Sequence, residues 1–323
     1  MTLHPIPENP CPPGVVEHRL VTSDGVALRA ARWTPESARG TIVLLGGRAE
    51  YIEKYFETIG DLLALGFSVA TLDWRGQGGS QRQLRDPMRG HIDDFSLFER
   101  DFRALARDVL TPHCPRPWIG LCHSMGGAVI MDIARAGRCP LDRIVLSAPM
   151  IALYGRPAPR SERWLVEALD GVGLGGAYVP GAGGSKPYSL YPFAGNLLTS
   201  DPLRYARLQK TIAARPELGL GGPTIGWLHA AFRLMRGLAE PDTPRAISTP
   251  TLVIACGADR VVGTSSIERF ASRLRAGDLI VIDGARHEIM IERDVYRDLF
   301  FTAFKPYALG AAAAFTSPFP AAP

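Results

Sequence analysis

Residues 118–127 read WIGLCHSMGG, an apolar run that ends in a serine flanked by small residues. The apolar part, residues 118–122, is typical of a strand that is buried on both faces of a sheet. A serine on a sharp turn from such a strand into a helix needs small neighbours, because the backbone must turn tightly to expose the hydroxyl oxygen. Gly126 and Gly127 meet that need, whereas Cys122 stands where glycine is usual. The stretch predicts a buried strand, a tight turn at Ser124 and a helix.

Five further apolar runs repeat this pattern along the chain, at residues 41–45, 68–72, 143–147, 251–255 and 278–282. Each is followed by a turn that contains Gly, Asp or Ser. Most then lead into a helical pattern, such as the three- and four-residue spacing of Phe95, Phe98 and Phe102. Alternating strands and helices predict an α/β fold, in which a mostly parallel sheet is flanked by helices. Residues 15–33 instead alternate and turn at 23–25, as an antiparallel hairpin does.

The alternation stops between residues 150 and 249, where no convincing buried strand occurs. Glycine-rich breaks separate amphipathic stretches there, and Ser200-Asp201-Pro202 and Thr224 are expected helix starts. We therefore expect one α/β core, residues 1–149 and 250–308, interrupted by a helical cap at residues 150–249. The alanine-rich residues 309–323 are expected to form a disordered tail.

A carboxylate and an imidazole follow two of the other predicted strands. Asp259 comes after residues 251–255, and His287 comes after residues 278–282. Ser124, Asp259 and His287 thus stand in the order serine, acid, histidine, each at the carboxyl end of a strand, as in hydrolases built on such a sheet. Asp283 is a competing acid, but it lies only four residues from His287. This pattern predicts a catalytic triad.

The other histidines are expected to have structural roles. His91 precedes two aspartates at a helix start and is predicted to be a hydrogen-bonding residue. His123 adjoins Ser124 but should point away from it, because neighbouring side chains at such a turn project in opposite directions.

The triad chemistry also requires donors for the negative oxygen of a tetrahedral intermediate. The amide of Met125 is one candidate, because it lies at the start of the helix after Ser124. The second candidate is the amide of Arg48, in the loop after residues 41–45. Gly47 in that loop lets the backbone approach the substrate closely.

Charge and cysteine content exclude several classes of protein. The chain of 323 residues has 36 basic and 32 acidic residues, a balance that indicates no nucleic-acid partner. Its five cysteines lack the paired spacing of metal ligands and are expected to be reduced thiols. No stretch approaches the roughly 18 apolar residues of a membrane-spanning helix, and no secretory signal begins the chain. We expect a cytoplasmic protein, at most peripheral to the membrane.

Arginine accounts for 32 of the 36 basic residues. Four of them flank the predicted site: Arg48, Arg75, Arg260 and Arg286. Because arginine suits phosphate and carboxylate groups, these positions suggest the hypothesis of an anionic head group or membrane surface near the site.

At these residues the sequence resembles the α/β-hydrolases of the lysophospholipase L2 and monoacylglycerol lipase group. The matching pieces lie at residues 47–51, 73–80, 123–127, 147–149, 257–259 and 284–288. The resemblance covers most of residues 15–305, and it implies a Ser-Asp-His hydrolase with a helical cap over the site and no cofactor. Gly46, Gln77 and Cys122 depart from the family pattern. The first two should leave the backbone donors intact, whereas the Cβ of Cys122 must fit beside the turn.

The predicted function is a serine carboxylic-ester hydrolase that forms an acyl-enzyme, with a lysophospholipid or monoacylglycerol as substrate. The cap would line the acyl pocket, with Trp227 and Tyr191 among its aromatic candidates, and Gly47 would contact the substrate. The expected partners are a small-molecule acyl ester and, transiently, a membrane surface.

Two alternatives stay open. One is a proline iminopeptidase-like aminopeptidase, which would use carboxylates of the cap to hold a substrate amine; the candidates are Glu162, Glu167, Asp170 and Glu217. The other is a catalytically inactive binding protein on the hydrolase fold. Cys122 slightly favours this second reading, and the intact triad residues oppose it.

Overall fold

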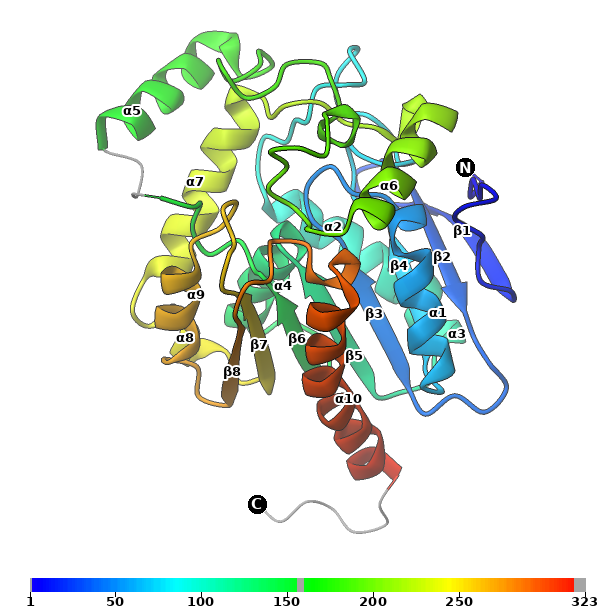
Figure 1. Ribbon diagram of the computed structural model, residues 1–323. Coiled ribbons are helices and arrows are strands. Elements are labelled where there is room, and N and C mark those ends of the chain that lie inside the picture. The colour runs from blue at the N-terminus through cyan, green and yellow to red at the C-terminus, as the bar shows by residue number, and fades with distance from the viewer. Residues whose placement is uncertain (1, 156–159, 317–323) are drawn as a thin grey trace.

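A single twisted sheet runs through the computed structural model, which describes residues 2–155 and 160–316 (Figure 1). Its eight strands are β1 (Val15–Val21), β2 (Ala27–Trp33), β3 (Thr41–Leu45), β4 (Ser68–Leu72), β5 (Trp118–His123), β6 (Arg143–Ser147), β7 (Thr251–Cys256) and β8 (Gly277–Ile282). They lie in the order β1-β2-β4-β3-β5-β6-β7-β8. The pairs β1/β2 and β2/β4 are antiparallel, and the others are parallel. The predicted hairpin and the mostly parallel sheet are confirmed.

The strands differ in burial according to their place in the sheet. Every residue of β3, β4, β5 and β7 is buried, as their continuous apolar sequences predict. The expectation of a buried strand at residues 278–282 is wrong, because β8 is an edge strand, and Leu279 and Ile280 in it are exposed. Apolar sequence alone does not distinguish a central strand from an edge strand.

Helices cover both faces of the sheet. Figure 1 shows α1 (Phe56–Ala64) and α10 (Asp294–Thr316) in front of the strands, and α2 (Ser96–Leu105) and α4 (Met125–Arg135) behind them. The apolar spacing of Phe98 and Phe102 buries both rings against the core. The remaining core elements are η1 (Ile52–Tyr55), η2 (Ala106–Leu110), α3 (Thr111–His113), α9 (Thr264–Ala271) and η6 (Ile289–Ile291).

Between β6 and β7 the described part of the chain forms helices and loops, with no strand beyond isolated bridges. Its elements are α5 (Arg160–Leu169), η3 (Asp170–Leu174), η4 (Tyr188–Leu190), α6 (Pro202–Ala214), η5 (Pro216–Leu218), α7 (Ile225–Ala239) and α8 (Thr243–Ala246). The side chain of Asp201 accepts hydrogen bonds at the start of α6, and that of Thr224 accepts one at the start of α7. Both predicted helix starts are confirmed.

The C-terminal segment differs from the expectation. Residues 309–316, predicted to be disordered, continue α10, and residues 317–323 lie outside the described residues. Ala308, Ala311 and Ala312 are buried against the core, and the guanidinium of Arg143 donates to the carbonyl of Tyr307 at 3.2 Å. Alanine has the highest helix propensity, and its small side chain allows this close packing. Among the described residues, no helix is long and apolar enough to cross a membrane.

Candidate active site

Ser124 occupies the turn between β5 and α4, with φ 48° and ψ −114°. These angles are uncommon for a residue with a side chain, and neighbouring backbone groups hold them in place. The Ser124 amide donates to the carbonyl of Ser147 at 3.0 Å, and its own carbonyl accepts from the amide of Met150 at 3.0 Å. The predicted sharp turn is therefore present.

Small residues make this turn possible, as the sequence predicts. A Cβ on Gly126 would lie 2.6 Å from the carbonyl oxygen of Gly46, so only glycine fits there. The fully buried Cys122 replaces the usual glycine without disturbing the turn. Its Sγ lies over Gly120, where an added Cβ would come within 3.1 Å of the sulfur. Gly120 thus provides the space that Cys122 fills.

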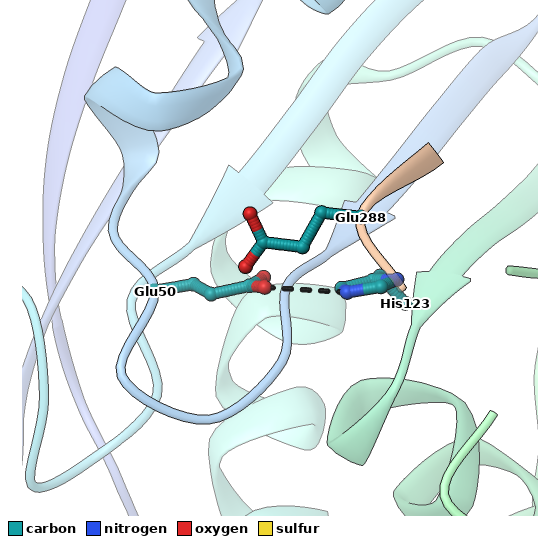
Figure 2. A group of neighbouring side chains, drawn as sticks. All are labelled: Glu50, His123 and Glu288. Carbon is teal, nitrogen blue, oxygen red and sulfur yellow. Dashed lines mark ion pairs between the residues drawn. The ribbon is translucent and has the colours of Figure 1, made fainter. Parts of the chain in front are cut away.

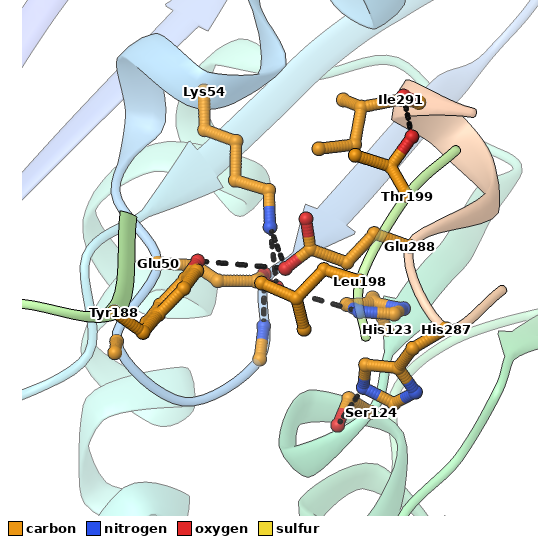
Figure 3. A network of polar contacts seen from close by, with 12 residues as sticks. Glu50, Lys54, His123, Ser124, Tyr188, Leu198, Thr199, His287, Glu288 and Ile291 are labelled. Carbon is orange, nitrogen blue, oxygen red and sulfur yellow. Dashed lines mark hydrogen bonds and ion pairs between the residues drawn. The ribbon is translucent and has the colours of Figure 1, made fainter. Parts of the chain in front are cut away.

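The three predicted triad residues lie together at the carboxyl end of the sheet. The Nε2 atom of His287 is 3.0 Å from the Oγ of Ser124, and its Nδ1 atom is 2.7 Å from Oδ2 of Asp259. Figure 3 shows the His287 ring beside Ser124. All three residues are buried, whereas the competing Asp283 is exposed. The distances suit a proton relay from serine to imidazole, with the carboxylate on the far nitrogen.

Asp259 is held in its charged form. Burial would raise the pKa of Asp259, but the hydrogen bond from His287 and the amides of Val261 and Val262 outweigh burial and keep the pKa below its usual value. The two amides donate to Oδ1 at 2.7 and 2.9 Å, which leaves Oδ2 for the imidazole. A carboxylate so placed fixes the tautomer with a proton on Nδ1.

The two predicted backbone donors belong to segments that adjoin Ser124. Met125 is the first residue of α4, where an amide has no acceptor within the helix. Gly47, which precedes Arg48, lies against Ser124, since a Cβ on Gly47 would be 3.1 Å from the Ser124 Cβ. The side chain of Gln77 braces this loop by donating to the carbonyl of Gly47 at 2.7 Å.

Of the predicted substrate contacts, only Gly47 is placed against Ser124. Trp227 is buried beside Phe95, and the guanidinium of Arg48 lies 5.2 Å from its ring centroid. The hydroxyl of Tyr191 donates to the carbonyl of Gly183 within the cap. These contacts give Trp227 and Tyr191 packing roles in the structure.

The arginines near the site mostly brace loops instead of facing it. Arg75 pairs with Asp24 and Asp101, each at 2.7 Å. Arg48 donates to the carbonyl of Gly221 at 2.7 Å, and Arg286 donates to backbone carbonyls of the cap. The hypothesis that these three side chains bind an anionic head group is therefore not supported, and Arg260 alone keeps that possibility.

The predicted structural role of His91 agrees with the structure, whereas the amine-binding role suggested for Asp170 is not supported by it. The ring of His91 bonds to the hydroxyl of Thr224 at 2.8 Å and to Asp93 at 3.0 Å, so it is a structural residue. Among the cap carboxylates, Asp170 is already paired with His229 at 2.7 Å.

A buried charge cluster, which the sequence did not predict, lies behind the triad: Glu50, Lys54, His123 and Glu288 (Figures 2 and 3). The Nζ atom of Lys54 is 2.8 Å from Glu50 and 2.6 Å from Glu288. Burial would raise the pKa of Glu50, but Lys54 and His123 outweigh it and lower the pKa to about 2. The four-residue spacing of Glu50 and Lys54 was the feature of the sequence that could have indicated this cluster.

His123 connects this charge cluster to the triad. Its Nδ1 atom lies 3.1 Å from the carbonyl of Ser147, and its ring centroid lies 4.8 Å from that of His287. Burial lowers the pKa of His123 to about 3, so its imidazole is neutral near neutral pH. His123 therefore packs against the proposed base without competing for its proton.

The residue types in the charge cluster also occur in metal sites. Ligand atoms of Glu50, His123 and Glu288 lie within 4.8 Å of one another. The ammonium of Lys54 contacts both carboxylates, however, and it already supplies the positive charge that a metal ion would bring. We therefore interpret these residues as an ion-pair network.

A cavity of about 650 Å³ lies between α7 of the cap and α9 of the core. Its walls are mostly apolar and include Ile151, Leu228, Phe232, Met235 and Phe270. Ile151 directly follows Met150, whose amide binds the carbonyl of Ser124. The volume is within the range of small-molecule sites, about 300–1,000 Å³.

Comparison with known proteins agrees with this arrangement. The family model described as serine aminopeptidase, S33, matches residues 36–294. Lysophospholipase L2 of Escherichia coli K12 is 32% identical over 288 residues, which cover 85% of this chain and 82% of that protein. Monoacylglycerol lipase of Mycolicibacterium smegmatis is 28% identical, over 85% and 91% of the two chains.

Solved structures show the same fold at lower identity. A thermostable carboxyl esterase from Bacillus coagulans superposes with a TM-score of 0.75 at 19% identity, covering 93% of this chain and 99% of the esterase. A soluble variant of monoglyceride lipase from Saccharomyces cerevisiae superposes with a TM-score of 0.69 at 18% identity, covering 92% of this chain and 97% of the lipase. The α/β-hydrolase architecture expected from the sequence is confirmed.

Proposed function

This chain belongs to the family described as serine aminopeptidase, S33, and from that membership we propose that it hydrolyses carboxylic esters through Ser124, His287 and Asp259. The observation that carries the proposal is the pair of contacts made by His287, 3.0 Å to Ser124 and 2.7 Å to Asp259. A serine hydroxyl is a weak nucleophile until a neighbouring imidazole accepts its proton.

In the proposed reaction, the Ser124 oxygen bonds to the carbonyl carbon of the ester while its proton moves to Nε2 of His287. The negative oxygen of the tetrahedral intermediate is stabilised by the amides of Met125 and Arg48. Collapse of the intermediate breaks the bond to the alcohol, which leaves with the proton from His287. Water then attacks the acyl-enzyme by the same steps in reverse, and a carboxylic acid and free Ser124 result.

We propose a monoacyl lipid, a lysophospholipid or monoacylglycerol, as the substrate. Two relatives of this chain are named lysophospholipase L2 and monoacylglycerol lipase. The apolar cavity beside α7 is large enough for an acyl chain, which supports the same substrate class.

The proposal includes contact with a lipid surface. Trp164 and Leu165 on α5 of the cap are 68% and 52% exposed, and they are neighbours in sequence, so they offer adjacent apolar side chains for a lipid surface. Co-sedimentation with phosphatidylcholine vesicles should weaken in Trp164→Ser, and equal binding of this variant and the wild type would remove this part of the proposal.

The test is labelling with a fluorophosphonate probe, followed by assays on lysophosphatidylcholine, monoacylglycerols, short esters and aminoacyl amides. Ser124→Ala and His287→Ala should abolish labelling, and Ser124→Ala should lower kcat by about 10⁴–10⁶-fold. Failure of the wild type to react would refute the serine-hydrolase proposal. Cleavage of aminoacyl amides in preference to esters would replace it with an aminopeptidase.

A further inference from the structure

The loop that carries His287 is held from the cap side. The amide of Glu288 donates to the carbonyl of Leu198 at 2.8 Å, and the amide of Arg286 donates to Oε1 of Glu292 at 3.1 Å. The residues on either side of His287 are therefore both fixed. Figure 3 shows Leu198 of the cap beside Glu288 and His287.

Glu292 is the central acceptor of this arrangement, and it is fully buried. Besides the Arg286 amide, its carboxylate accepts the amide of Ser200 at 2.9 Å, the hydroxyl of Ser200 at 2.6 Å and the amide of Arg293 at 2.9 Å. The hydroxyl of Thr199 lies 3.4 Å away. These donors are uncharged, and hydrogen bonds to a buried carboxylate are about twice as strong as neutral ones.

Three further hydrogen bonds join the same segments. The hydroxyl of Thr199 donates to the carbonyl of Ile291 at 2.8 Å (Figure 3). The guanidinium of Arg286 donates to the carbonyls of Asn196 and Thr199 at 3.0 and 3.1 Å. Cap residues 196–200 and core residues 286–292 are thus tied at several points along their length.

This tie matters because His287 must meet two partners at once. Ser124 and Asp259 follow β5 and β7, so the sheet fixes their positions, whereas His287 lies on a loop beyond the edge strand β8. A displacement of about 1 Å in reacting groups can cost about 100-fold in rate. The cap contacts hold this loop from one side, and the ion pair of Glu288 with Lys54 holds it from the core.

We propose that Glu292 is a positioning residue, which ties cap residues 196–200 to the His287 loop and so aligns the base with Ser124 and Asp259. The proposal rests on the proposed function of the triad. It implies that this part of the cap stays on the core during turnover, and that substrate enters by movement elsewhere in the cap.

The main variant is Glu292→Gln. Every partner of the carboxylate is a donor, so the amide group of glutamine faces a donor in either orientation. We expect kcat on the preferred ester to fall about 100-fold while KM changes by less than about threefold. The downfield proton resonance of the His287–Asp259 hydrogen bond should broaden or disappear.

Ser200→Ala is the milder variant, and it also covers the case in which Glu292→Gln does not fold. It should lower kcat about tenfold, because it removes one hydrogen bond to Glu292, and Ser200→Thr should restore kcat to within about threefold of the wild type. The matched control is Asp94→Asn. Asp94 also joins the core to the cap, through an ion pair with Arg233 of α7 at 2.9 Å, and its side chain accepts the amide of Ser96, so neither contact involves residues 286–292.

The proposal is overturned if folded Glu292→Gln or Ser200→Ala keeps wild-type kcat and the downfield resonance, or if Asp94→Asn loses as much activity as they do. The downfield resonance allows the positioning role of Glu292 to be tested independently of the proposed esterase activity. A wild type that lacks esterase activity but shows the resonance, which Glu292→Gln then loses, would refute the function and leave the positioning role intact.

Discussion

Replacing Lys54 by methionine tests the buried charge cluster beside the triad. The ammonium lies 2.8 and 2.6 Å from Glu50 and Glu288, and all three side chains are at most 4% exposed. Methionine has a similar length but no charge, so the variant leaves two buried carboxylates facing each other. Removing one partner of a buried ion pair costs about 3–5 kcal/mol. The entropy of unfolding is about 0.7 kcal/mol/K for a chain of this length, so the Tm should fall by about 4–7 °C.

The pH dependence of this loss has a definite sign. Burial, with the charge of Glu50 adding to it, holds the pKa of Glu288 above its usual value, even though Lys54 opposes the shift. Without Lys54 this pKa rises further. A group with a raised pKa in the folded state loses its stabilising contribution as the pH rises through that pKa. The deficit of Lys54→Met should therefore be larger at pH 8 than at pH 5, measured as the free energy of unfolding in urea.

Lys210→Met is the matched control. Its ammonium is also 2.8 Å from a carboxylate, that of Glu8, but the two side chains are 55% and 47% exposed. An exposed pair contributes at most about 1 kcal/mol. The reasoning is refuted if Lys54→Met costs no more than Lys210→Met, or if its deficit is larger at pH 5 than at pH 8.

Three further predictions concern the turn at Ser124 and the C-terminal helix. Gly126→Ala places a Cβ 2.6 Å from the carbonyl oxygen of Gly46, so it should push the loop that carries Arg48 away from Ser124. We expect kcat in the ester assay to fall at least about tenfold, and an unchanged kcat would contradict this prediction. Burial raises the pKa of the Cys122 thiol well above its usual value, so iodoacetamide should modify it only after unfolding, and modification of the native protein, detected by mass spectrometry, would disprove the burial. Ala311→Asp buries a charge and should destabilise the protein by several kcal/mol in thermal melts, whereas the exposed Ala314→Asp should cost less than about 0.5 kcal/mol. Equal losses in the two variants would show that α10 does not pack as described.

The fold was predictable wherever its cause is local. The central strands have continuous apolar sequences because both faces are covered, and the helix starts at Asp201 and Thr224 follow from side chains that accept backbone hydrogen bonds. The errors have non-local causes. The exposure of β8 depends on its place at the sheet edge, and the order of residues 309–316 depends on packing of alanines against the core.

The candidate site divides in the same way. Ser124, Asp259 and His287 could be identified because each follows a strand, and the ends of parallel strands meet at one edge of the sheet. The charge cluster and the tie through Glu292 could not, although Glu288 adjoins His287 in sequence. Desolvation strongly opposes the burial of a charge, so a lone Glu or Lys in a sequence is expected at the surface.

Such a residue is buried where the fold brings a partner of opposite charge to it from a distant part of the chain. Lys54 comes from the segment after β3, and Glu288 from the loop after β8; each is stable in the interior because the other is there. Glu292 is a similar case, because Ser200 of the cap supplies two of the donors to its buried carboxylate. A cap that lacked these donors would leave the Glu292 carboxylate with only the backbone amides of Arg286 and Arg293 among the donors described above. The cap and the His287 loop are therefore interdependent, and a substitution in one should be tested by its effect on the other.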